Sequence, residues 1–150
     1  MRIFEIMSEK PRTVPPTLPA ADAWRLMIAE NVHHLIVKDG SKVVGVLSDS
    51  DAGGRHGAAV RSGMTVADLM DRHFAAITRQ DTARKAANLM RGRMIGCLPV
   101  IERDRLLGVI TVTDLLALLG HGVERPDHET RAALHHRVAH RRATTSSGRW

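Results

Sequence analysis

An internal repeat is the feature that most constrains this chain. Asp114 lies 63 positions after Asp51, and at that offset residues 5–51 align with residues 68–114 without a gap. The identical pairs are Met7/Met70, Ala20/Ala83, Ala23/Ala86, Leu26/Leu89, Met27/Met90, Leu35/Leu98, Val37/Val100, Gly45/Gly108, Val46/Val109 and Asp51/Asp114. A register kept over so many residues indicates a tandem duplication. Because a unit of about 50 residues buries little surface alone, we expect the two copies to share one core.

Both copies predict the order strand, helix, strand, strand, helix. Small and apolar residues at helical spacing place amphipathic helices over 20–27 and 83–90, with Pro19 as a first helical residue and Asp81 as an N-cap. A β-rich hairpin follows each helix, and closing helices are expected over about 51–60 and 113–119. The fold class is therefore α+β, as tandem β-α-β-β-α repeats at residues 1–62 and 63–120, with a basic His/Arg-rich tail at 121–150.

Each hairpin ends in the same heptad, a glycine, two apolar residues, a hydroxyl residue, two spacers and an aspartate, at residues 45–51 and 108–114. A helix N-terminus presents free N–H groups that favour phosphate. An aspartate there can accept hydrogen bonds from both ribose hydroxyls, and a Ser or Thr three residues earlier can reach the same ligand. The same residue types also cap helices where no ligand binds. The pattern therefore leaves open a nucleoside site and a purely structural cap.

Two such heptads in register, each closing a β-α-β-β-α repeat, resemble the cystathionine β-synthase (CBS) domain pair, or Bateman module, over residues 1–120. The resemblance implies a regulatory, energy-sensing module without catalytic activity that binds AMP, ADP or ATP and requires no cofactor. It also implies a homodimer that acts on a protein partner which the sequence does not identify. S-adenosylmethionine and NAD remain alternative ligands.

In the family, each of two clefts joins the heptad of one repeat to the first strand and hairpin entrance of the other. Carried over, site A comprises Ser48, Asp51, Ala76, Ile77, Cys97 and Leu98. Site B comprises Thr111, Asp114, Thr13, Val14, His34 and Leu35.

The two sites differ in their expected phosphate contacts. Arg55 follows Asp51 in a glycine-rich stretch, whereas the residues after Asp114 are apolar, so site A is expected to bind phosphorylated ligands more tightly. Site B would depend on Lys10, Arg12 or His34, and with His34 its affinity would rise as the pH falls through about 6.5.

Other classes of function find little support in the sequence. It holds no nucleophile motif, paired cysteines or metal-binding motif, so we expect neither an enzyme nor a metal site. A single cysteine, no membrane span and no signal peptide predict a cytoplasmic protein.

Four scattered aromatics argue against a nucleic-acid platform, although the tail carries six Arg against three acidic residues. The tail is expected to form a short helix from Asp127 and to pack on a partner subunit or stay loose. Two alternatives therefore remain: a ligand-free structural or interaction module, and a nucleic-acid-associated regulator that acts through its tail.

Overall fold

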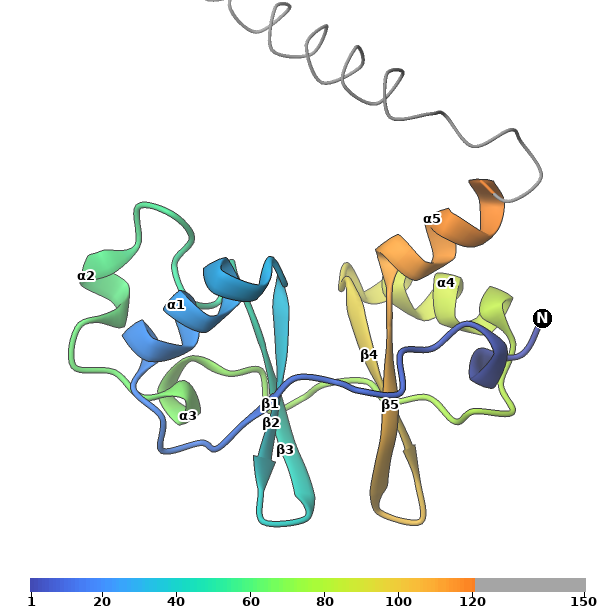
Figure 1. The fold of residues 1–150 in the computed structure, drawn as a ribbon, viewed down its shortest axis with the longest axis horizontal. Helices are drawn as coiled ribbons and strands as arrows, with labels where there is room; N and C mark the ends of the chain where they lie inside the picture. The colour runs from blue at the N-terminus through green and yellow to red at the C-terminus, as the bar shows by residue number, and fades with distance from the viewer. Residues whose placement is uncertain (121–150) are drawn as a thin grey trace, which may run out of the picture. The chain divides into compact units, whose positions relative to one another are not determined.

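The structure, a computed structural model, describes residues 1–120 (Figure 1). The chain divides into two units, Met1–Leu116 and Ala117–Trp150. The elements of the described residues are a 3-10 helix Ile3–Glu5, β1 Thr13–Val14, α1 Ala20–Glu30, β2 His34–Asp39, β3 Lys42–Ser48, α2 Ala58–Arg61, α3 Val66–Leu69, α4 Ala83–Arg93, β4 Cys97–Glu102, β5 Arg105–Thr111 and α5 Val112–Gly120. All but the last turns of α5 lie in the first unit. The predicted α+β tandem repeat is confirmed.

The two sheets differ by one strand. In the first repeat β1 pairs in parallel with β2, which pairs antiparallel with β3. In the second, β4 and β5 form an antiparallel pair, and the expected first strand is reduced to one parallel bridge between Ile77 and Val100. The reason is Pro99. Its counterpart Ile36 donates its backbone N–H to the Arg12 carbonyl at 2.9 Å, and a proline has no N–H to donate.

The repeats share their interior, as the duplication predicts. Each has its own cluster between helix and sheet, and both Met27 and Met90 are buried there. A third cluster brings Ile36 and Val46 of the first repeat against Cys97 of the second. Joining apolar surface in this way removes from water the sheet faces that each repeat alone would expose.

Each repeat is also clasped by the segment that leads into the other. Ser8 pairs with Val109 on β5 through hydrogen bonds of 2.9 and 3.0 Å, so the start of the chain lies against the second repeat (Figure 1). In the same way Asp71 pairs with Val46 on β3. This exchange carries residues 8–12 from β5 in the second repeat across to β2 in the first, where the Arg12 carbonyl accepts the Ile36 N–H.

The helix boundaries correct two predictions. Pro19 is the N-cap of α1 and not its first residue. Thr82, and not Asp81, caps α4: its hydroxyl accepts the Lys85 N–H at 3.2 Å, while Asp81 accepts from Thr78. Asp81 is thereby already occupied by the turn before the helix.

The prediction of a helix over residues 51–60 is also wrong. Turns follow Asp51, with Gly53 and Gly54 at φ of 89° and 67°, and only Ala58–Arg61 is helical. Glycine disfavours helix by about 1 kcal/mol relative to alanine. Arg61 stabilises these turns. It is buried, with 6% of its surface exposed, and it donates hydrogen bonds to the carbonyls of Ala52 and Gly54, both at 2.7 Å. The helix expected over 113–119 is confirmed as α5.

Candidate functional site

Two neighbouring pockets lie where the repeats meet, and we name them pocket A and pocket B after the predicted sites. Pocket A, of about 330 Å³, is lined by His34, Val46, Ser48, Asp49, Ser50, Asp51, Asp71, Phe74, Ala75, Met94, Ile95, Gly96 and Cys97. Pocket B, of about 480 Å³, is lined by Ser8, Lys10, Pro11, Arg12, Asn31, Val32, His33, His34, Ile36, Gly96, Cys97, Val109, Thr111, Val112, Thr113 and Asp114. Both volumes are in the range of small-molecule sites.

Pocket A brings together only part of predicted site A. Ser48, Asp51 and Cys97 line it. Ile77 and Leu98 lie in the core of the second repeat, and neither Ala76 nor Arg55, both exposed, lines the pocket. The apolar wall comes instead from residues that the sequence reading missed, Phe74, Ala75 and Ile95.

Pocket B likewise combines Thr111, Asp114 and His34 and leaves out Thr13, Val14 and Leu35. Val14 and Leu35 are buried under α1 in the core of the first repeat. Successive side chains of a strand point to opposite faces, so His34 and Ile36 face the pocket where Leu35 faces the core. Ile36 was not among the predicted site residues, although the alternation of side chains along the strand would have placed it on the same face as His34.

In each heptad aspartate, one of the two carboxylate oxygens accepts hydrogen bonds from its own turn. Asp51 Oδ2 accepts the Ser48 N–H at 3.1 Å, and the Asp51 N–H donates to Ser48 Oγ at 3.0 Å. Asp114 Oδ2 accepts from the backbone N–H and hydroxyl of Thr111 at 2.8 and 3.0 Å. In residues 1–120 no hydrogen bond involves the Oδ1 atom of either aspartate, so one acceptor oxygen remains for a ligand hydroxyl at each site.

The same turn occurs twice away from the pockets. Asp68 accepts from the N–H and hydroxyl of Thr65 at 2.8 and 3.0 Å, and Asp81 from those of Thr78 at 2.9 and 3.0 Å. The hydrogen bond from the Thr65 backbone lowers the pKa of Asp68. Since neither aspartate lines pocket A or B, these local bonds alone do not mark a ligand site. What distinguishes Asp51 and Asp114 is the cavity beside them.

The two pockets carry opposite charge. Among residues 1–120, pocket A is lined by Asp49, Asp51 and Asp71 and by no lysine or arginine. In the same described part of the chain, pocket B is lined by Lys10 and Arg12 and by one carboxylate, that of Asp114. An anion gains from nearby fixed cations and is repelled by carboxylates. The lining charges therefore favour a phosphorylated ligand in pocket B, the reverse of the ranking expected from Arg55.

His34 stands between the pockets and, with Gly96 and Cys97, lines both. Its ring packs on Gly96 so closely that a Cβ there would lie 3.1 Å from Cε1. Burial lowers the pKa of His34, outweighing the opposite effect of the Asp49 charge. Burial, with a contribution from the Asp114 charge, raises the pKa of the Cys97 thiol to about 12. At neutral pH the shared wall is thus an uncharged imidazole and a protonated thiol.

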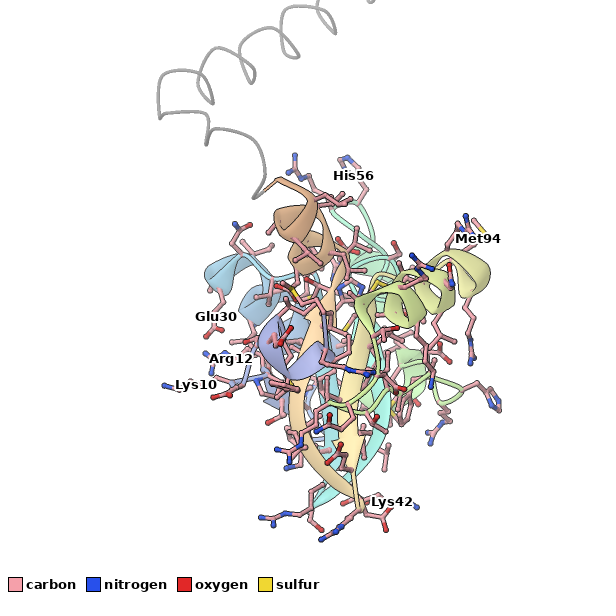
Figure 2. The ribbon with its side chains drawn as sticks, turned by 90° about the vertical axis from the view of Figure 1, so that its right-hand side faces the viewer. Lys10, Arg12, Glu30, Lys42, His56 and Met94 are labelled. Atoms are coloured by element: carbon pink, nitrogen blue, oxygen red, sulfur yellow. The ribbon has the colours of Figure 1, made fainter. Side chains whose placement is uncertain are left out.

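The lowered pKa of His34 predicts a loss of stability in mild acid. The unfolded chain takes up a proton near pH 6.5 that folded His34 resists, so the free energy of unfolding should fall as the pH drops below about 6.5. Urea unfolding of the His34→Gln variant between pH 7 and 5 should show a smaller fall than the wild type. His56→Gln, at an exposed turn (Figure 2), is the control, and equal slopes for wild type and His34→Gln would contradict the prediction.

Comparison with known proteins decides the family. The family model of the CBS domain matches residues 3–52 and 66–121, that is, both repeats. The chain belongs to the CBS-domain family. A CBS domain-containing protein of Bacillus subtilis, YhcV, is 28% identical over 114 residues, which cover 75% of this chain and 81% of YhcV.

Two further relatives extend this comparison. The CBS domain pair of protein MJ0100, solved in complex with 5′-methylthioadenosine and S-adenosyl-L-methionine, is 23% identical with a TM-score of 0.74, covers 82% of this chain and 98% of that pair, and shows the shared fold. Homoserine O-acetyltransferase of Methanocorpusculum labreanum is 27% identical over 113 residues, 74% of this chain. That match covers 23% of the enzyme, so this CBS pair spans about a quarter of that relative's length.

None of the helices in residues 1–120 has the length and apolar character needed to cross a membrane. Residues 1–120 contain no group of three or more His, Cys, Asp or Glu side chains placed to hold a metal ion. The predictions for the tail, a helix from Asp127 and contacts with a partner, concern residues outside those that the structure describes.

Proposed function

We propose that this CBS pair is a regulatory module that binds an adenine nucleotide, AMP, ADP or ATP, and that the phosphorylated ligand occupies pocket B. The observation that carries the proposal is the pairing in one cavity of a free Asp114 carboxylate oxygen with the cations Lys10 and Arg12. A nucleotide has the complementary arrangement, with vicinal hydroxyls on the ribose and negative charge at the phosphate. MJ0100 provides a precedent for adenosine-containing ligands on this fold.

The lining of pocket B assigns a role to each part of such a ligand. Asp114 would accept from the ribose hydroxyls in charge-assisted hydrogen bonds. The base would lie among apolar side chains, of which Val32, Ile36 and Val109 line the cavity. Lys10 and Arg12 would bind the phosphate from the segment that crosses between the repeats. Binding would thus hold the first segment of the chain against both repeats, so that occupancy of pocket B could change the conformation of the module.

Pocket A suits a different nucleoside. Its ribose acceptor, Asp51, is accompanied by Asp49 and Asp71, which repel phosphate. An uncharged nucleoside or one carrying a positive sulfonium, such as S-adenosylmethionine, would meet no such penalty. The proposal for pocket A therefore includes the alternative ligand that the sequence left open.

A ligand-free structural module is the competing proposal, and a specific observation favours it: Asp68 and Asp81 make the same turn and line neither pocket A nor pocket B. In that case Asp51 and Asp114 would only shape the turns at the ends of β3 and β5. The homodimer, the protein partner, the cytoplasmic location and the lack of catalytic activity stay predictions under either proposal.

Calorimetry on the full chain separates the two proposals. We expect AMP to bind at a CBS-pair site more tightly than adenosine by about tenfold or more, because Lys10 and Arg12 act only on the phosphate. The difference should shrink as salt is raised, since exposed charges are screened. The absence of binding heat for AMP, ADP, ATP, adenosine and S-adenosylmethionine would favour the structural module. Equal affinity for AMP and adenosine would contradict the phosphate role of pocket B.

A further inference from the structure

An ion pair between Arg12 and Glu30 lies at the edge of pocket B, and only its arginine lines the pocket. Arg12 lines the pocket, and its Nε and Nη2 atoms both face the carboxylate of Glu30, which does not line it. Figure 2 shows the two side chains together beside Lys10. The side chains are 51% and 29% exposed. Exposed pairs of this kind stabilise a fold by about 1 kcal/mol at most, so stability gives little reason for the pair.

The position of Glu30 also works against its helix. Glu30 is the last residue of α1, where the partial negative charge of the helix end disfavours a carboxylate. In the second repeat the corresponding residue is Arg93, which suits the helix end, and the residue corresponding to Arg12 is Ala75. The pair therefore belongs only to the repeat that supplies Arg12 to pocket B.

We propose that Glu30 is a specificity-determining residue of pocket B, whose carboxylate engages Arg12 and makes an incoming phosphate compete for it. The inference rests on the proposed function of pocket B. Two of the donor atoms of the guanidinium are held by Glu30, and the carboxylate offsets the charge that Arg12 brings to the cavity. Lys10 forms no ion pair within residues 1–120, so it is the cation of the lining that no carboxylate engages directly. Glu30 thereby weakens anionic ligands and leaves uncharged nucleosides unaffected.

The test is the Glu30→Gln variant of the full chain, titrated calorimetrically with AMP, adenosine and inorganic pyrophosphate. We expect AMP and pyrophosphate to bind about three- to tenfold more tightly than to the wild type, with adenosine unchanged within about twofold. In an Arg12→Gln background the same substitution should change anion affinity by less than about twofold, because the released guanidinium is absent. Asp22→Asn is the matched control, since it removes a carboxylate paired with Arg25 at 2.9 Å at the other end of α1.

The outcomes are distinct. Unchanged or weaker anion binding in Glu30→Gln, or an equal gain in the Arg12→Gln background or in Asp22→Asn, would overturn the role of Glu30. If neither AMP nor adenosine binds the wild type, the proposed function fails. An Arg12-dependent gain in pyrophosphate affinity would still support the role of Glu30, and its absence would still overturn it.

Discussion

Replacing Gly108 by alanine is expected to lower the free energy of unfolding by about 2 to 3 kcal/mol, the cost of forcing an extra carbon into a packed interior. A Cβ on Gly108 would lie 2.4 Å from the Ser8 carbonyl oxygen. That oxygen accepts the Val109 N–H at 3.0 Å, so the alanine would push the first segment of the chain off β5. Because Ser8 and Val109 line pocket B, nucleotide binding there should weaken as well. Urea unfolding and calorimetry of the same variant measure both effects.

Gly45 is the matched control, since it holds the same place in the first heptad. Its Cβ would meet the Met70 sulfur at 2.6 Å, at the flexible part of a side chain, and the Asp71 carbonyl only at 3.1 Å. A side chain can move where a hydrogen-bonded backbone cannot, so Gly45→Ala should cost less than Gly108→Ala. A larger loss of unfolding free energy for Gly45→Ala would show that the glycine of the motif is not required by the pairing of Ser8 with β5.

The Asp114→Ala variant should bind AMP about 10- to 100-fold more weakly, a loss of about 1.5 to 3 kcal/mol for a charge-assisted pair of hydrogen bonds. The structure separates this effect from stability. Asp114 uses Oδ2 for Thr111, so the variant should also lose about 1 kcal/mol of folding free energy with no ligand present. Calorimetry measures the first loss and urea unfolding the second.

Asp68→Ala provides the control for that separation. It removes the same pair of local hydrogen bonds, from Thr65, at a position that lines neither pocket. It should therefore cost similar stability and leave AMP affinity unchanged. Asp51→Ala tests the division between the pockets: adenosine binding in pocket A should weaken while AMP binding in pocket B persists. Unchanged AMP affinity in Asp114→Ala would contradict the proposal that the aspartate of the second heptad binds the ribose.

Several features of the site could be predicted because they depend on local sequence. The heptads predicted that Ser48 and Asp51, and Thr111 and Asp114, would lie together where a hairpin ends, and the structure places each pair at one turn beside one pocket. Cys97 and His34 were expected at the clefts and line them. Ala76, Leu98, Thr13 and Leu35 each missed the pockets by one residue, and Ile77 and Val14 missed them by two. A strand reverses its facing side at every residue, so for Leu98 and Leu35 an error of one position exchanges cavity for core.

The charge of the pockets could not be predicted, because it depends on contacts between distant segments. Arg55 was expected at pocket A from its distance along the chain to Asp51, on the assumption of a helix. Gly53 at φ 89°, and Arg61 bonded to Ala52 and Gly54, make that segment a set of turns, and Arg55 lies outside the pocket. Lys10 and Arg12 reach pocket B because Ser8 is held on β5, about 100 residues further along.

The amino-acid sequence by itself determined the duplication, the order of elements and the residues of the two heptads, because periodicity and short-range hydrogen bonding act between near neighbours. Only the tertiary structure decided which side chains share a cavity. The clasp of Ser8 on Val109 and that of Asp71 on Val46 set the composition of each pocket, one cationic and one acidic. Such pairings lie between segments far apart in the chain, and their free energy depends on a shared core that neither repeat encodes alone.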